Sequence, residues 1–280
     1  MESNLFGERE SAGISPIAPW IGGKRNLAKR LVKLISAVDH DLYAEAFVGM
    51  AGVFLRRRYA PKAEVINDYS GDVANLFRIL QRHYPQFLDC LKFQVTSRSE
   101  FERLSRTDPT TLTDLERAAR FLYLQRTAFG GKVTGQTFGV SNEREGRFNL
   151  TTLAPMLEQV HERLAGVVIE NLSYQDFIPR YDRPGALIYC DPPYFGCEED
   201  YGKGLFDRAD FERLADLMRA AEGKVILSIN DVPEIRAVFD GFATKPVRVT
   251  YTISEAPPTE VGELIITNFE HPLLNEKAGL

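Results

Sequence analysis

Hydrophobic and polar positions alternate along the chain in a way that predicts a parallel sheet with helices between its strands. Residues 24–36 carry apolar side chains at helical spacing, and a short apolar segment at 42–47 follows as a strand. A glycine-rich turn, a helix through Phe54 and Leu55, and a second strand at 64–67 come next. This order of strand, helix, strand and helix is typical of α/β proteins.

The alternation is interrupted between residues 78 and 160. This block is mostly helical in its periodicity and contains a polar, glycine-rich stretch, AFGGKVTGQTFGVSNEREGRF. The sheet pattern then resumes, with strands expected at 167–172, 186–190, 225–229, 247–253 and 264–269, and a helix at 208–222. The last two strands have no helix between them, so we expect an antiparallel pair there. We therefore expect one α/β domain, formed by 16–77 and 161–272, with 78–160 inserted as a second domain.

Composition narrows the class of protein. Of the 280 residues 44% are hydrophobic, which is enough for a packed core and excludes global disorder. No apolar run approaches the roughly 20 residues of a membrane span, and the polar N-terminus does not resemble a secretory signal. The three cysteines form neither a paired framework nor a zinc motif, and the histidines show no metal spacing. We expect a cytoplasmic protein without a metal.

Charge is unevenly distributed along the chain. The net charge is −5, but residues 117–150 carry six basic and two acidic side chains, whereas 191–280 carry 17 acidic and nine basic ones. A basic segment in an acidic chain is typical of a surface that binds a polyanion. A solvated helix face has the same composition, so charge alone leaves both interpretations open.

The most specific pattern is the run Asp191–Pro192–Pro193–Tyr194, directly after the expected strand at 186–190. In a parallel sheet this position faces the crevice in which ligands bind. Two consecutive prolines restrict the backbone and remove two N–H donors, so the loop offers carbonyl oxygens without competing amides. Together with the carboxylate of Asp191 and the flat ring of Tyr194, these oxygens suit a planar ring that carries an exocyclic amino group.

A glycine-rich turn with the sequence FVGMAG runs from Phe47 to Gly52 and includes Gly49. Asp68 ends the second strand, 19 residues after Gly49. Glycines there let the backbone approach a ligand closely, and an acidic residue at about this distance can bind ribose hydroxyls. The same pattern serves NAD, FAD and S-adenosylmethionine.

Two further segments carry candidate chemistry. Trp20, Gly23 and Lys24 belong to the run WIGGK before the first helix, where free N–H groups and a cation could hold a carboxylate. Asp176 stands 15 residues before Asp191 and just after the strand at 167–172. Its carboxylate could accept a hydrogen bond from an adenine amino group or cap a helix.

These features, in this order, resemble the Dam-like DNA adenine-N6 methyltransferases. The matching segments are WIGGK, FVGMAG, the Asp of VINDYS, DF, YCDPPY and the closing ELIITNF. The resemblance implies a Rossmann-like methyltransferase sheet with a helical target-recognition domain inserted after its second strand, in agreement with the break at residue 78. Two positions depart from the family pattern, because Ala46 replaces a proline and Ala51 stands where the second glycine is usual.

The resemblance also implies roles for individual residues. S-adenosylmethionine would be contacted by Trp20, Gly23, Lys24, Phe47, Gly49, Gly52, Asp68, Asp176 and Asp191. The catalytic residues would be Asp191, Pro192, Pro193 and Tyr194. A hairpin at about 126–149 would enter double-stranded DNA through Arg126, Phe129, Lys132, Gln136, Arg144 and Arg147. We expect the enzyme to act on DNA as a monomer, with an oligomer as the alternative.

The expected reaction is methyl transfer to the exocyclic amine of a flipped adenine. Asp191 and the Pro192 carbonyl would accept the N–H bonds of the amine and localise its lone pair, while Tyr194 stacks on the extruded base. Other functions stay open. Cytosine-N4 methyltransferases use a similar loop in which serine is commoner than aspartate, and protein glutamine methyltransferases usually have asparagine there. A nucleotide-dependent dehydrogenase needs neither the double proline nor WIGGK, and a non-catalytic DNA-binding module leaves the DPPY run unexplained.

Overall fold

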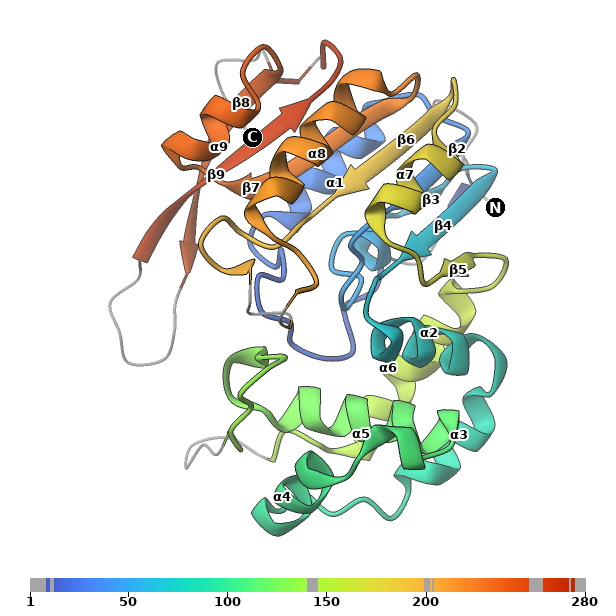
Figure 1. Cartoon of the computed structure of the whole chain (residues 1–280). Coiled ribbons are helices and arrows are strands. Elements are labelled where there is room, and N and C mark those ends of the chain that lie inside the picture. The colour runs from blue at the N-terminus through green and yellow to red at the C-terminus, as the bar shows by residue number, and fades with distance from the viewer. Residues whose placement is uncertain are drawn as a thin grey trace.

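The computed structural model describes residues 9–10, 13–139, 146–198, 202, 204–251, 259–271 and 273–274 of the chain. In these parts the central element is a seven-stranded sheet with the strand order β5-β4-β2-β6-β7-β9-β8 (Figure 1). The strands are β2 (Leu42–Glu45), β4 (Ala63–Asn67), β5 (Val168–Glu170), β6 (Ala186–Cys190), β7 (Lys224–Asn230), β8 (Ala243–Tyr251) and β9 (Thr259–Thr267). β9 runs antiparallel to both of its neighbours, and the other pairs are parallel. The expected α/β class and the antiparallel pair at its end are confirmed.

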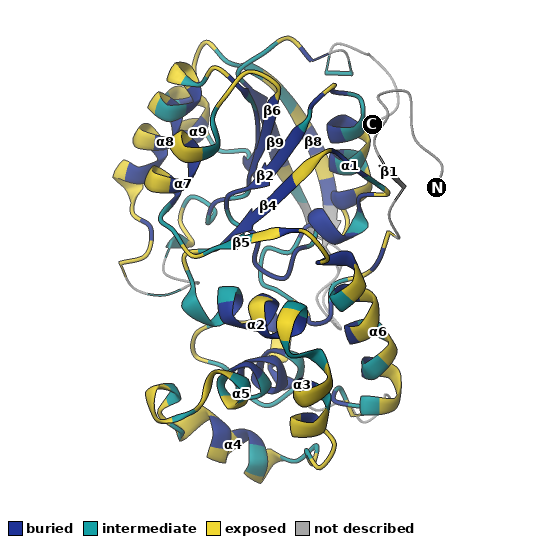
Figure 2. Cartoon of the chain, turned by 90° about the vertical axis from the view of Figure 1, so that its right-hand side faces the viewer, coloured by how far each residue is buried: buried dark blue, intermediate teal, exposed yellow. Residues whose placement is uncertain are grey.

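Helices cover both faces of the sheet (Figures 1 and 2). α7 (Tyr174–Tyr181), α8 (Arg208–Ala220) and α9 (Pro233–Val238) lie on one face, and α1 (Ala28–Ser36) lies on the other. Strand side chains alternate between two buried cores, so that Tyr43 and Tyr189 pack on the α1 side and Ile188 packs on the α8 side. This arrangement leaves the carboxyl edge of the parallel strands as the place where loops from both faces meet.

Two of the expected helices differ from the observed ones. The helix expected from residue 24 begins at Ala28, because the preceding residues form turns in which Gly22 has a φ of 68°. The helix expected through Phe54 and Leu55 is a short 3-10 segment, η1 (Phe54–Arg56). A two-stranded pair of β1 (Arg9–Glu10) and β3 (Tyr59–Ala60), which the pattern did not indicate, lies outside the main sheet.

A block of helices lies beyond the carboxyl ends of the parallel strands (Figure 1). It consists of α2 (Gly71–Arg82), α3 (Tyr84–Leu91), α4 (Arg98–Arg106), α5 (Asp114–Thr127) and α6 (Leu150–Arg163), with the 3-10 segments η2 (Pro109–Thr111) and η3 (Phe129–Gly131). Thr113 and Glu116 form a capping box that fixes the start of α5. The expected domain limits at 78 and 160 fall inside α2 and α6. None of the helices in the described parts is both long and apolar enough to cross a membrane.

Candidate functional site

The carboxyl edge of the sheet brings the glycine-rich turn and the DPPY loop together. Glu45, at the end of β2, is in register with Tyr189 of β6 and with Ile66 of β4. The segments that follow these strands are the FVGMAG turn, the DPPY loop and Asp68. Because all three strands are parallel and in register, their following residues lie side by side at one edge.

A buried cluster of charged and polar groups lies at the start of the DPPY loop. The Lys24 Nζ atom is 2.7 Å from Oδ1 of Asp191 and donates a hydrogen bond of 2.7 Å to the hydroxyl of Tyr194. This hydroxyl in turn donates to Oε1 of Glu263, whose Oε2 atom is 3.7 Å from Lys24 Nζ. The side chains of Lys24 and Glu263 are 1% and 0% exposed, whereas that of Asp191 is 19% exposed. Lys24 and Glu263 are thus closed off from solvent, whereas Asp191 and the half-buried Tyr194 are the members of this cluster that a ligand can reach.

Strand β7 supports the same loop from the other side. Ser228 donates to Oδ1 of Asp191 over 3.4 Å, and its hydroxyl is 2.7 Å from that of Tyr189. Asn230 accepts from the backbone N–H of Phe195 at 2.9 Å and donates to the carbonyl of Phe195 at 3.0 Å. The loop is thus held at both its beginning and its end, as a preorganised acceptor requires.

Burial raises the pKa values of two carboxyl groups beside this cluster. Desolvation raises the pKa of Asp191 to about 6, although the nearby Lys24 ammonium acts in the opposite direction. Burial also raises the pKa of Glu45 to about 8, against the hydrogen bond of 2.9 Å that the Tyr43 hydroxyl donates to its Oε2. The charge of Asp191 contributes to the raised pKa of Glu45. At neutral pH the pair therefore carries one negative charge, on Asp191.

The FVGMAG turn contacts both Asp68 and the WIGGK segment. The amide of Gly49 donates to Oδ2 of Asp68 at 2.8 Å, and the amide of Ser70 donates to Oδ1 at 2.9 Å. Burial raises the pKa of Asp68 to about 6, and these two amides oppose the shift. Gly49 has a φ of 48°, and a Cβ atom there would lie 2.5 Å from Nε1 of Trp20. The Trp20 ring therefore packs directly on the glycine backbone.

The remaining candidate cofactor residues lie around these two turns. The amide of Gly23 donates to the Trp20 carbonyl at 3.0 Å and closes the turn before Lys24. Phe47 packs against Tyr174 of α7, with ring centroids 5.6 Å apart. Gly52 accepts a hydrogen bond from the Arg56 side chain through its carbonyl.

Asp176 supports the cap of a helix without being the cap itself, because Ser173 is the N-cap of α7. It is exposed at the third position of α7 and accepts a hydrogen bond of 2.7 Å from the hydroxyl of Ser173, while its amide donates to that hydroxyl at 3.1 Å. The cap orients the carboxylate at the end of β5, on the same edge of the sheet as Asp68. A contact with a cofactor stays a prediction.

The expected hairpin is present in part between residues 127 and 139. The amide of Phe129 donates to the Thr137 carbonyl, and the amide of Gly139 donates to the Thr127 carbonyl, both over 2.8 Å. Phe129 is 44% exposed and Lys132 is exposed. Arg144 lies outside the described residues.

Three of the candidate DNA-binding side chains hold this hairpin in place. Arg126 donates to the carbonyls of Ile17 and Arg147, the latter at 3.1 Å. Arg147 donates to the Ala128 carbonyl at 2.9 Å, and Gln136 donates to the Lys132 carbonyl at 2.8 Å. The structure therefore gives these three side chains a role in loop geometry that the sequence did not indicate.

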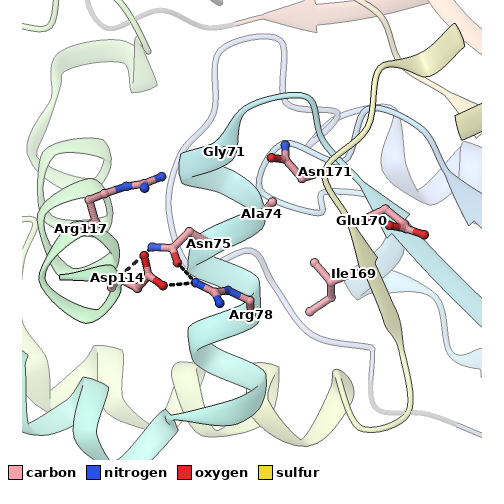
Figure 3. A pocket seen from close by; sticks show the side chains of 9 residues that line it. All are labelled: Gly71, Ala74, Asn75, Arg78, Asp114, Arg117, Ile169, Glu170 and Asn171. Carbon is pink, nitrogen blue, oxygen red and sulfur yellow. Dashed lines mark hydrogen bonds and ion pairs between the residues drawn. The ribbon is translucent and has the colours of Figure 1, made fainter. Parts of the chain in front are cut away.

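A separate pocket of about 270 Å³ lies between α2, α5 and the edge strand β5 (Figure 3). Its lining includes Arg78 and Asp114, which form an ion pair, and Arg117. The rest of the lining comes from α2 and from the end of β5, and none of the lining residues belongs to the DPPY cluster. Among the residues that the structure describes, no group of three or more metal-ligating side chains is present.

Sequence reasoning missed several residues at the site. Glu263 lies in the segment ELIITNF, where a charged residue inside an apolar strand pattern indicates a buried ion pair. Ser228 and Glu45 gave the same type of signal within expected strands. Tyr69, next to Asp68, is 53% exposed and offers an aromatic face beside the FVGMAG turn.

Comparison with known proteins gives a consistent result. The family model for D12 class N6 adenine-specific DNA methyltransferases matches residues 20–253. The type II methyltransferase M.CviBI of Paramecium bursaria Chlorella virus NC1A is 25% identical over 231 residues, covering 82% of this chain and 88% of that protein. The DNA adenine methylase of Haemophilus influenzae is 25% identical over 269 residues, covering 88% of this chain and 90% of that protein. The family match extends over the glycine-rich turn, the helical block and the DPPY loop.

Proposed function

Because this chain belongs to the D12 class N6 adenine-specific DNA methyltransferases, we propose that it transfers a methyl group from S-adenosylmethionine to the exocyclic amine of adenine in duplex DNA. The observation that carries the proposal is the Asp191 carboxylate, which is partly exposed and held by Lys24 and Ser228 beside the FVGMAG turn. The WIGGK, FVGMAG and DPPY segments, which are far apart in the sequence, meet at this point.

The chain's own residues fit S-adenosylmethionine. Asp68 is positioned by two amides at the end of β4, where an ionised carboxylate would accept hydrogen bonds from ribose hydroxyls. The exposed ring of Tyr69 would pack on the adenine of the cofactor, and Asp176 would accept a hydrogen bond from its amino group. Gly49, which has a positive φ and no side chain, lets the Trp20 ring pack on the turn and shapes the backbone that the cofactor would approach. When bound, this cofactor supplies an electrophilic methyl group.

Asp191 would orient and then deprotonate the target amine. Lys24 and Ser228 both bind Oδ1, so among the described residues Oδ2 is the oxygen left for the substrate. Oδ2 and the Pro192 carbonyl would accept the two N–H bonds of the amine, which localises the nitrogen lone pair. After methyl transfer the nitrogen holds one excess proton. A carboxylate with a pKa of about 6 can take this proton and release it to solvent at neutral pH.

The helical block would bind DNA. It lies beyond the carboxyl ends of the strands, on the side towards which the DPPY loop opens (Figure 1). The exposed Phe129 and Lys132 on its hairpin would contact bases and phosphate, while Arg126, Arg147 and Gln136 hold the hairpin in shape. We infer that residues 78–160 serve as the target-recognition domain.

The test is incubation of the chain with methyl-labelled S-adenosylmethionine and mixed-sequence duplex DNA, followed by nucleoside analysis and mapping of the modified positions. We expect N6-methyladenine at a defined DNA sequence. Asp191→Ala should abolish this product, while the far-ultraviolet circular dichroism spectrum, which reports the fold, stays unchanged. Asp216→Asn, an exposed substitution on α8, is the matched control and should retain full activity. Label in N4-methylcytosine or in protein, or full activity of Asp191→Ala, would overturn the proposal.

A further inference from the structure

We infer that Glu263 of β9 is a positioning residue for methyl transfer, because it holds Lys24 and Tyr194 in the geometry that leaves one oxygen of Asp191 available for the target amine. The inference rests on the proposed function and adds to it a residue that does not touch the substrate. Three observations carry it: the place of Glu263 in the sheet, its two contacts, and the position of Lys24 between two carboxylates.

The antiparallel direction of β9 places Glu263 at the reacting edge of the sheet. Glu263 is in register with Asn230, the last residue of β7, and Asn230 holds the DPPY loop through Phe195. β7 ends at the reacting edge, whereas β9 runs in the other direction, away from this edge. The single reversed strand thus brings a fully buried carboxylate from the C-terminal part of the chain beneath the loop that follows β6.

Glu263 fixes Tyr194 through the hydroxyl group. The Tyr194 hydroxyl donates to Oε1 of Glu263, and the Lys24 ammonium lies 4.2 Å from the centre of the Tyr194 ring. One end of the ring is therefore anchored in the protein interior. The hydroxyl bond fixes the end of the ring and the ammonium lies over its face, so the ring is held in position before a base arrives.

Lys24 is shared between two carboxylates. Its ammonium is 2.7 Å from Asp191 and 3.7 Å from Glu263, and the lysine side chain is almost fully buried. A buried ammonium needs a counter-charge, and two carboxylates divide its attraction. Without the charge of Glu263, Lys24 would pair with Asp191 alone and make it a weaker acceptor for the amine.

The charged groups around Asp191 make the proposed role of Glu263 measurable through the pKa of Asp191. The titratable groups that interact with Asp191 are Lys24, Tyr194, Glu263 of β9, Glu45 of β2, and Tyr189 and Cys190 of β6. Of these, Lys24 lowers the pKa of Asp191 and Glu263 raises it. Removal of the Glu263 charge therefore lowers the pKa of Asp191.

The experiment compares wild type with Glu263→Gln, which keeps an oxygen for the Tyr194 hydroxyl but removes the charge. We expect kcat at pH 8 to fall about tenfold, with KM for S-adenosylmethionine unchanged, and the acidic limb of the kcat profile to move to lower pH. The matched control is Thr267→Val, four residues further on the same face of β9, where the hydroxyl donates to the Phe269 carbonyl. This control should lower the melting temperature but leave the acidic limb of the kcat–pH profile where it is in the wild type.

A second variant and a second measurement keep the inference testable if Glu263→Gln folds poorly or if DNA is not the substrate. Tyr194→Phe removes the hydroxyl that reaches Glu263 and should also lower kcat. Carboxyl ¹³C resonances of labelled aspartate, assigned with Asp191→Asn, report the titration of Asp191 without any substrate. An unchanged midpoint for Asp191 in Glu263→Gln, or an unchanged kcat in both variants of an active enzyme, would overturn the inference. Failure of wild type to modify DNA would instead overturn the proposed function.

Discussion

At the scale of single residues, the site depends on carboxyl groups whose pKa values burial has raised into the physiological range. Asp191 and Asp68 each have a pKa of about 6, and each has partners that favour its charged form, Lys24 in one case and two backbone amides in the other. Both proposed roles, accepting N–H bonds from the target amine and O–H bonds from ribose, need the ionised carboxylate. Both roles are therefore lost when the carboxylates of Asp191 and Asp68 become protonated.

We expect activity to fall as the pH drops through about 6. Protonation of Asp191 removes the acceptor and lowers kcat, whereas protonation of Asp68 weakens cofactor binding and raises KM for S-adenosylmethionine. Steady-state kinetics between pH 5 and pH 8.5 separate the two effects, and calorimetric titration of wild type and Asp68→Asn with the cofactor isolates the contribution of Asp68. In Asp68→Asn the cofactor affinity should be low and independent of pH. Equal kcat at pH 5 and pH 8 would contradict the role of Asp191.

The two glycines of the FVGMAG turn are expected to differ sharply in their tolerance of alanine. Gly49 has a positive φ, and a Cβ atom there would overlap the Trp20 ring, so Gly49→Ala should lower the free energy of unfolding by about 2 kcal/mol and weaken cofactor binding. At Gly52 the nearest atoms to a Cβ are 3.8 Å away, so Gly52→Ala is the matched control. Urea unfolding and cofactor titration of both variants test this. Equal behaviour of the two would show that Trp20 does not pack on Gly49.

At the scale of elements, a buried ion-pair network joins the helical block to the sheet. Glu64 of β4 binds Arg57 at 2.6 Å and Arg163, at the end of α6, at 2.6 Å and 2.8 Å. The three side chains are 2% to 6% exposed. The single carboxylate of Glu64 is therefore the shared counter-charge of two buried guanidinium groups, one beside the sheet and one at the end of the helical block.

Loss of this carboxylate should destabilise the whole protein. In Glu64→Gln two buried guanidinium groups lose their counter-charge, and the free energy of unfolding should fall by about 3 kcal/mol. Glu102→Gln on α4 removes an exposed ion pair and should cost less than about 0.5 kcal/mol. Urea denaturation followed by circular dichroism measures both. A loss for Glu64→Gln no larger than that of the control would mean that the network does not join the two parts.

The sequence predicted the elements of the sheet well because their signals are local. Strands such as β6 are continuous apolar runs, and the expected helix at 208–222 is observed as Arg208–Ala220. The sequence pattern placed the start of α1 four residues too early. Its apolar spacing continues into the turns before the helix, and these turns, marked by the positive φ of Gly22, are visible only in the structure. Ala51, with a φ of 57°, occupies a left-handed position that suits glycine, which explains the glycine usual at this position in the family.

The sequence identified candidate site residues only where they belong to a recognisable motif. Asp191, Gly49 and Asp68 were identified by their position after strands. The role of Glu263 depends on the reversal of β9, which sets its register against β7, and register is a long-range property. Arg126 resembled an exposed DNA-binding residue because charge patterns do not distinguish a side chain in solvent from one that bonds the carbonyl of Ile17, more than a hundred residues earlier.

At the scale of the whole molecule, an acidic chain must bind an acidic polymer. With a net charge of −5, long-range electrostatics oppose the approach of DNA, so binding has to come from a local basic surface. The basic segment at 117–150 belongs to the helical block that faces the reacting edge of the sheet (Figure 1). Part of its charge is used internally, since Arg117 pairs with Asp72 and Arg126 bonds backbone carbonyls. Few phosphate contacts are then expected from the described part of this segment.

Salt dependence distinguishes the basic residues that contact phosphate from those that hold the fold. For the wild type, the logarithm of the DNA association constant should fall linearly with the logarithm of salt concentration. Lys132→Ala should reduce this slope by about one unit, because the exposed ammonium would release one counterion. Arg126→Ala should leave the slope unchanged and lower the melting temperature, because its half-buried guanidinium bonds the Ile17 and Arg147 carbonyls. Fluorescence anisotropy at several salt concentrations measures the slope, and a reversed assignment of the two residues would show that the hairpin turns its other side to DNA.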